Sequence, residues 1–226
     1  MDFWRQTLTI AIKDLRAELR SKEAINASFS FSLTILLLFS FAFDPTEETT
    51  REIAGGLLWI VFAFAGALIL NRSFARELPN DCLDALIAAP LPASALLLGK
   101  ALANLGLLLA MEAVCFPVFG LFYNVRWTRQ FWPLVLVVVL GTWGFTVIGT
   151  MFSALTVNIR LREVMLPLLV YPVMIPCLMA AMSLTNHLVG GNPMDSEMLV
   201  WMKFLIGFDV IFTSLALVLV DVVLVG

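Results

Sequence analysis

Four ionisable side chains fall inside or beside long apolar stretches of this 226-residue sequence. They are Lys100, Glu112, Asp209 and Asp221. At the centre of a membrane-spanning helix a charge is unfavourable by at least about 2.5 kcal/mol, so each needs a physical reason to be there. Glu112 and Asp209 lie near the middle of their stretches and are candidate intramembrane functional residues, placed to line a proton or ligand path. The alternative is that each is protonated and hydrogen-bonded within a helix bundle.

Lys100 and Asp221 lie close to the ends of their stretches. A charged side chain in such a position can extend to the aqueous boundary while its apolar stem stays in the membrane. We therefore expect these two residues to be hydrated rather than functional.

The single histidine, His187, is the candidate haem ligand, because imidazole is a common axial ligand of haem iron. A surface histidine in a loop is the alternative. The three cysteines, Cys82, Cys115 and Cys177, are far apart and form no CxxC pair, which indicates reduced thiols and no metal site.

No catalytic motif is present in the sequence. It contains no GxxxxGK[ST] phosphate loop, HExxH metal motif or GxSxG nucleophile motif. We expect no catalytic residues and no bound cofactor, and any ATP hydrolysis must belong to a partner. No dense basic patch lies beyond the N-terminal segment, which argues against nucleic-acid binding.

The composition indicates the kind of protein in which these ionisable side chains lie. Hydrophobic residues make up 61% of the chain, and the mean hydropathy is +0.95. This apolar content far exceeds that of water-soluble domains, so lipid must solvate part of the surface. Six stretches are long enough to cross a bilayer, and they predict an all-α integral membrane protein with one transmembrane domain. They cover about 25–43, 53–70, 93–122, 131–157, 164–189 and 198–225.

Residues 2–22 form a different kind of helix, amphipathic and too charged to span. Its apolar row is Trp4, Leu8, Ile12, Leu15 and Leu19, and its basic row is Arg5, Lys13, Arg16 and Arg20. This pattern is typical of a helix in the membrane interface, close to anionic lipid headgroups. A simple positively charged anchor is the alternative.

The distribution of Lys and Arg orients the spans. Basic residues gather in 1–24, 71–92 and 158–163, whereas acidic residues dominate the 44–52 connection. Since cytoplasmic segments carry the excess of Lys and Arg, both termini are expected in the cytoplasm. Arg126 and Arg129 are exceptions, because this topology places them outside.

The connection between the second and third spans predicts a short cytoplasmic helix over about 80–89. Asn80 or Asp81 can cap it, Asp84 favours its first turn, and Pro90 ends it. Its apolar residues are Leu83, Leu86 and Ile87. A helix of about two turns is not stable alone in water, so it needs a surface to lie on. A membrane interface or a groove in a cytoplasmic partner would serve.

The segment from Phe74 to Pro92, followed by Gly99 and Lys100, resembles the second cytoplasmic segment of the haem exporter protein B (CcmB) family. The proline-spaced run from Leu166 to Pro176 resembles the family's fifth span, and the resemblance extends over essentially the whole chain. Asp81 departs from the pattern, in which glycine is expected at that position.

The resemblance implies an ABC-2-type permease fold and a role in cytochrome c maturation in the bacterial inner membrane. The short helix would then dock on the ATP-binding subunit, through Asp81, Leu83, Asp84, Leu86 and Ile87. Four protein partners are implied: an ATP-binding subunit (CcmA-like), a haem-handling membrane subunit (CcmC-like), a small single-span subunit (CcmD-like) and a periplasmic haem chaperone (CcmE-like). Haem would be the cargo of the complex, and ATP would be bound by the partner.

Two other functions are compatible with the residues alone. The chain could serve another ABC-2-type exporter, or it could be an ion-coupled secondary transporter that uses Glu112 and Asp209. A co-purifying ATP-binding protein would distinguish these classes.

Overall fold

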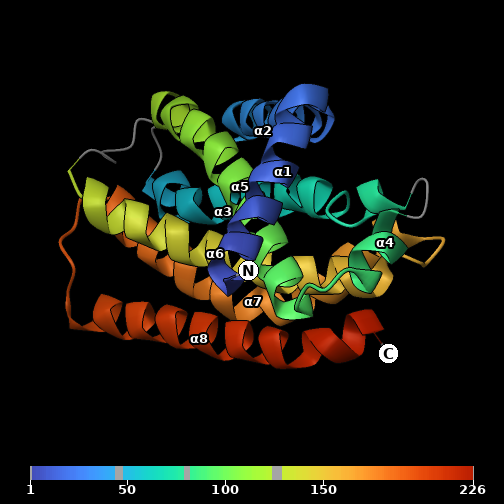
Figure 1. Cartoon of the computed structure of the whole chain (residues 1–226). Coiled ribbons are helices and arrows are strands. Elements are labelled where there is room, and N and C mark those ends of the chain that lie inside the picture. Colours follow the sequence, from blue (N-terminus) through green and yellow to red (C-terminus); the bar gives the residue numbers. More distant parts are fainter. Residues whose placement is uncertain (1, 44–47, 79–81, 124–128, 226) are drawn as a thin grey trace.

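The structure is a computed structural model that describes residues 2–43, 48–78, 82–123 and 129–225 (Figure 1). The helices are α1 (Phe3–Ser21), α2 (Glu23–Ala42), α3 (Glu48–Leu70), the 3₁₀ helix η1 (Ala75–Glu77), α4 (Cys82–Ala88), α5 (Ala93–Tyr123), α6 (Phe131–Thr156), α7 (Arg162–Val189) and α8 (Ser196–Val225). The described residues contain no strand. Six helices, α2, α3, α5, α6, α7 and α8, are long and apolar enough to cross a membrane. The all-α fold and the six spans are therefore confirmed.

The helices extend slightly beyond the predicted spans. The largest difference is at α3, which begins at Glu48 although its apolar stretch begins at Ile53. The apolar stretch marks only the part suited to lipid, whereas backbone hydrogen bonding continues through polar residues. Pro167, Pro172 and Pro176 do not interrupt α7, which is one helix from Arg162 to Val189.

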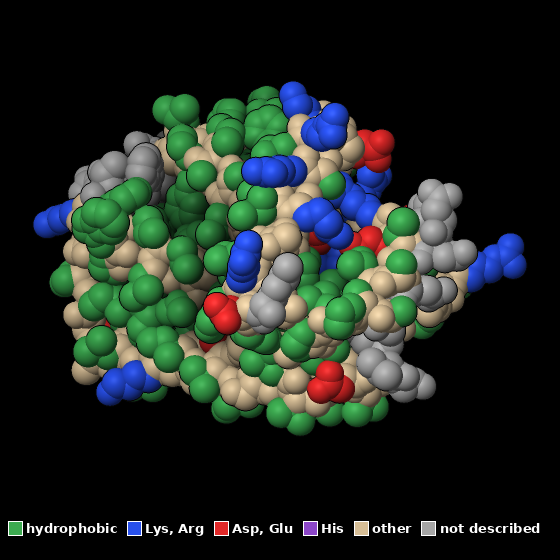
Figure 2. Space-filling view, in the orientation of Figure 1, with side chains coloured by type: hydrophobic (Ala, Val, Ile, Leu, Met, Phe, Trp, Pro, Cys, Tyr) green, Lys and Arg blue, Asp and Glu red, His purple; other side chains and the backbone are tan. Residues whose placement is uncertain are grey.

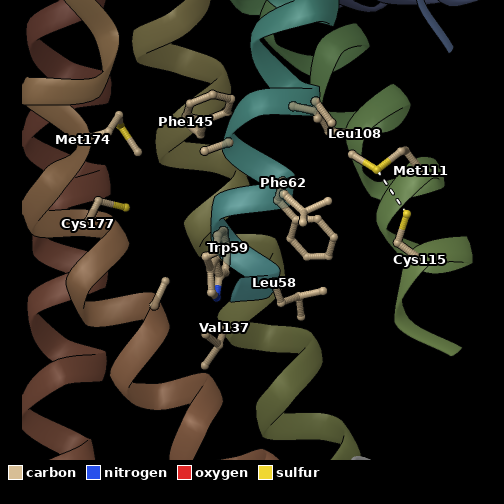
Figure 3. Packing of buried hydrophobic residues seen from close by; sticks show 14 of the residues in the cluster. Leu58, Trp59, Phe62, Leu108, Met111, Cys115, Val137, Phe145, Met174 and Cys177 are labelled. Atoms are coloured by element: carbon tan, nitrogen blue, oxygen red, sulfur yellow. Dashed lines mark hydrogen bonds between the residues drawn. The ribbon is translucent and has the colours of Figure 1, made fainter. Parts of the chain in front are cut away.

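The core is built around α3 and α6. Figure 3 shows α3 running between α5, α6 and α7, with Leu58, Trp59 and Phe62 among the packed side chains. Three large side chains each pack against a glycine of the other helix, where the missing Cβ makes room for them. The pairs are Trp59 with Gly141, Leu70 with Gly149 and Phe145 with Gly66.

The helix α1 lies across the front of the bundle, over α5 (Figure 1). The close approach requires glycine at position 99, because a Cβ there would lie 2.7 Å from the Ile10 Cβ and 2.8 Å from the Thr7 carbonyl oxygen. Most of the predicted apolar row of α1 points away from the bundle. Its exposed members are Trp4, Leu8, Ile12 and Leu19. An outward apolar row is what an interfacial helix needs, and the membrane contact itself stays a prediction.

A sharp corner at Lys22 joins α1 to α2. Lys22 has φ 57° and ψ 9°, the left-handed conformation, and its N–H donates to the Glu18 carbonyl oxygen at 2.6 Å. This bond is typical of a helix C-terminus. The corner lets the chain pass directly from a helix lying on the bundle into the first span.

Candidate functional site

The helix α4 lies at the end of the molecule that also holds the C-terminus (Figure 1), and we call it the α4 end. Leu83 of α4 is 7% exposed and packs into a cluster of apolar residues from the rest of the chain. The buried members are Ile10, Phe74, Leu96, Ala154 and Val157. The surface that the short helix needs is therefore supplied in part by the chain itself.

The predicted docking residues of α4 are divided by this packing. Leu83 anchors the helix inward, Leu86 is half-buried, and Cys82, Ala85 and Ala88 are exposed. Leu83, predicted to share the partner-binding face, is buried against α1, α5 and α6. Docking of α4 on a partner stays a prediction. Asp81 lies outside the described residues, as do the side chains of Asp84 and Ile87.

A partly buried group of charges lies where α1, η1 and α5 meet. We call it the ionic cluster, and its members are Lys13, Asp14, Glu18, Arg76, Glu77 and Lys100. Figure 2 shows Lys and Arg side chains gathered on this side of a surface that is otherwise largely hydrophobic. A buried charge is tolerated when opposite charges and hydrogen bonds surround it.

Lys100 is the centre of the ionic cluster and is only 1% exposed. Its Nζ lies 3.1 Å from Asp14 Oδ2 and 3.0 Å from Glu77 Oε2, and it donates to the Ser73 carbonyl oxygen at 2.8 Å. The same nitrogen lies 4.7 Å from the centre of the Phe74 ring. The prediction that Lys100 extends to water was wrong, because α1 and η1 cover it and provide the carboxylates.

Lys13 extends the ionic cluster toward the surface. Its Nζ donates to Glu77 Oε1 at 2.6 Å and lies 3.1 Å from Asp14 Oδ1. Partial burial by itself lowers the pKa of Lys13, but the hydrogen bond to Glu77 and the charge of Asp14 outweigh it and raise the pKa. Lys13 and Lys100 thus share the same two carboxylates.

Glu18 links the ionic cluster to the first span. It is 1% exposed, and its Oε1 accepts hydrogen bonds from the N–H groups of Ala24 at 2.8 Å and Ile25 at 3.0 Å. These N–H groups belong to the first turn of α2, where a carboxylate is favourable because backbone donors are free and the helix dipole is positive. Its other oxygen forms an ion pair with Arg76.

Glu112 is enclosed between α5 and α6. It is 2% exposed, and the Thr142 hydroxyl lies 2.9 Å from Oε1 and 3.0 Å from Oε2, so one donor serves both oxygens. The carboxyl lies on the wall of a cavity of about 420 Å³ whose other lining, including Phe116 and Phe131, is apolar.

Asp209 lies on the other side of α6. It is 5% exposed, and within the described residues neither of its carboxyl oxygens has a hydrogen-bond partner. A Cβ on Gly144 would lie 2.6 Å from Asp209 Oδ1, so glycine makes room for the carboxyl. Glu112 contacts Thr142 of α6, and Asp209 lies against Gly144 of the same helix. Residues two apart do not share a helix face. The structure therefore does not bring these acids together into one path.

His187 lies in the last turn of α7, at the opposite end of the bundle from α4. Its Nε2 lies 2.7 Å from the Pro193 carbonyl oxygen and 3.9 Å from Asp195 Oδ2. This nitrogen is thus engaged by the connection to α8, and haem ligation by His187 stays an untested prediction. No group of three or more His, Cys, Asp or Glu residues suited to a metal ion occurs in the part of the chain that is described.

Sequence reasoning missed the carboxylates of the ionic cluster. Asp14 and Glu18 are four residues apart among basic neighbours, a spacing that puts two acids on one face of α1. That spacing was a usable signal, whereas the position of Glu77 beside Lys100 depends on tertiary packing.

Comparison with known proteins gives a consistent result over most of the chain. The family model described as "CcmB protein" matches residues 5–221. Heme exporter protein B of Paracoccus denitrificans is 34% identical, covering 83% of this chain and 86% of that protein. The protein of the same name from Rhodobacter capsulatus is 33% identical over 77% of this chain and 80% of its own length. The Escherichia coli K12 protein is 27% identical over 92% of both chains.

Proposed function

Because the chain belongs to the CcmB family, we propose that it is the membrane permease subunit of an ABC-type haem export system for cytochrome c maturation. Its relatives are named as haem exporters, and six apolar helices provide the spans that such a subunit requires. The chain itself is non-catalytic, and a separate CcmA-like subunit binds and hydrolyses ATP. Haem is the cargo of the assembly rather than a resident cofactor.

The observation that carries the mechanism is that α4 packs on the bundle through one side and exposes the other. Leu83 fixes the helix to α1, α5 and α6, while Cys82, Ala85 and Ala88 are exposed on its outer side. Small exposed side chains let a partner backbone approach closely, and the half-buried Leu86 offers it an apolar contact. In this proposal α4 is the docking helix for the ATP-binding subunit, and the packing of Leu83 carries its displacement to α1 and α5.

The remaining partners follow from the same family membership. A CcmC-like subunit handles haem, a CcmD-like subunit adds a single span, and a CcmE-like chaperone receives the haem on the periplasmic side. The complex then lies in the bacterial inner membrane with both termini of this chain in the cytoplasm. This orientation is supported by the charge bias and puts the α4 end beside the ATP-binding subunit.

The test is co-purification of the ATP-binding subunit with matched leucine variants. We expect Leu86→Asp to abolish its recovery while the chain still inserts, because a charge replaces the apolar contact on α4. Leu161→Asp is the control, since Leu161 is 63% exposed in the α6–α7 connection at the same end of the molecule. Equal recovery of the subunit with both variants would contradict docking through α4.

A further inference from the structure

A cavity of about 780 Å³ opens at the α4 end between α2, α3, η1 and α7. Both basic and apolar side chains line it. The basic ones, Arg72, Arg76 and Arg162, follow α3 or begin α7, beyond the apolar parts of the spans. Of the apolar ones, Ala27 and Leu68 lie within the spans, whereas Ala24 is near the start of α2 and Ala75 is in η1.

The charged part of the cavity has unused capacity to bind an anion. Arg162 is half-buried and has no ion-pair partner among the described residues. Arg72 is paired with Glu23, but both side chains are exposed, at 44% and 67%, and an exposed pair exchanges partners at little cost. Two guanidinium groups are thus available to a phosphate, which they bind with good geometry.

One acceptor in the cavity is also unsatisfied. Asn71 Oδ1 is buried and has no hydrogen-bond donor within the described residues. A buried amide oxygen without a partner is unfavourable. A ligand that offers both an anionic group and a hydroxyl would satisfy Asn71 and the arginines together.

The apolar part of the cavity distinguishes a lipid from a soluble anion. Ala27 is exposed and lies in the second turn of α2, while Leu68 is 37% exposed in the last turn of α3. Both face the cavity from positions deeper in the membrane than the arginines. An acyl chain would cover Ala27 and Leu68, whereas a free phosphate would leave both side chains uncovered.

We propose that this cavity binds an anionic phospholipid of the phosphatidylglycerol class. Arg162 and Arg72 hold the phosphate, Asn71 accepts a hydrogen bond from a headgroup hydroxyl, and one acyl chain lies against Ala27 and Leu68. Glu23 and Glu163 also line the cavity. Both are exposed, so on lipid binding Glu23 exchanges Arg72 for water and both carboxylates leave the arginines to the phosphate. A basic pocket at the cytoplasmic side of a helix bundle is a recurring lipid site.

The proposal is tested by titrating the purified full-length chain with phosphatidylglycerol and counting bound lipid by native mass spectrometry. Phosphatidylcholine with the same acyl chains is the comparison with a zwitterionic headgroup, which has no net charge and no hydroxyl, and inorganic phosphate is the soluble comparison. The variants are Arg162→Gln, which removes an unpaired charge from the cavity, and Ala27→Phe, which fills the apolar part. Arg160→Gln is the matched control, because Arg160 is exposed two residues away and does not line the cavity.

We expect Arg162→Gln to weaken phosphatidylglycerol binding about fivefold, the usual effect of one basic residue near an anionic headgroup. Arg160→Gln should bind as the unaltered chain does, and Ala27→Phe should lose lipid although all arginines remain. Three results would overturn the proposal: equal loss in the two arginine variants, phosphatidylcholine binding as tightly as phosphatidylglycerol, or inorganic phosphate binding as tightly as the lipid.

Discussion

Glu18 of α1 and Arg76 of η1 form an ion pair across 58 residues of sequence, with the Glu18 side chain only 1% exposed. The same carboxylate caps the first turn of α2 through the N–H groups of Ala24 and Ile25. One side chain thus fixes the α1–α2 corner and attaches it to the segment that leads into α4.

The first prediction concerns this carboxylate. Glu18→Ala leaves two backbone donors and the Arg76 guanidinium without their partner, so we expect a loss of about 3–5 kcal/mol in the free energy of unfolding. Glu18→Gln keeps an acceptor for α2 and should lose less. Unfolding of the purified chain in detergent measures both. Glu23→Ala is the control, because its exposed pair with Arg72 is worth about 1 kcal/mol or less, and a similar loss there would contradict the role of Glu18.

The second prediction concerns Lys100. Lys100→Met leaves Asp14 and Glu77 close together without the buried cation, so stability should fall by about 3–5 kcal/mol. Adding Glu77→Gln removes part of the uncompensated charge and should restore some stability, which a double-mutant cycle would detect. Lys203→Met, at an exposed position of α8, should have little effect. Additive losses in the cycle would show that Lys100 and Glu77 do not interact.

A third prediction uses two glycines of the spans. Gly99→Ala places a Cβ 2.7 Å from Ile10, so α1 must move off α5 and stability should fall by about 1–3 kcal/mol. Gly207→Ala is the control, since a Cβ there meets nothing within 4 Å and should be neutral or slightly stabilising. Protease sensitivity of α1 gives a second readout, which should rise only in the Gly99 variant.

The two leucines of α4 should behave differently. Leu83→Ala removes a buried side chain and should destabilise the chain by about 2–5 kcal/mol. Leu86 is half-buried, so Leu86→Ala should change stability less and affect recovery of the ATP-binding subunit more. If Leu83→Ala left thermal unfolding unchanged, the anchoring of α4 to the bundle would be wrong.

The two intramembrane acids provide the test against ion-coupled transport. Glu112→Gln keeps the hydrogen bond from Thr142, and Asp209→Asn keeps the side-chain shape in the space beside Gly144. We expect cytochrome c maturation to survive both changes, because in the proposed function energy enters through ATP hydrolysis by a partner subunit. Loss of maturation by a fully assembled, ATP-hydrolysing complex would instead place a proton or ligand path in this subunit.

The elements were predictable from sequence because lipid selects long apolar stretches directly. The boundaries of α5 and α6 were therefore expected within one residue, at Ala93–Tyr123 and Phe131–Thr156. The position of Lys100 was not predictable, since its burial depends on how α1 crosses α5 at Gly99. The inward direction of Leu83 was missed for a similar reason, because the short helix packs on residues from α1, α5 and α6.

The glycine contacts between α3 and α6 restrict how the protein can change shape. Displacing one helix along the other by a single residue, about 1.5 Å, would drive Trp59, Leu70 and Phe145 away from the glycines that make room for them. We therefore expect these two helices to move together as one rigid pair. Any alternation between states has to occur by rotation of this pair as one body or by movement of the helices around it.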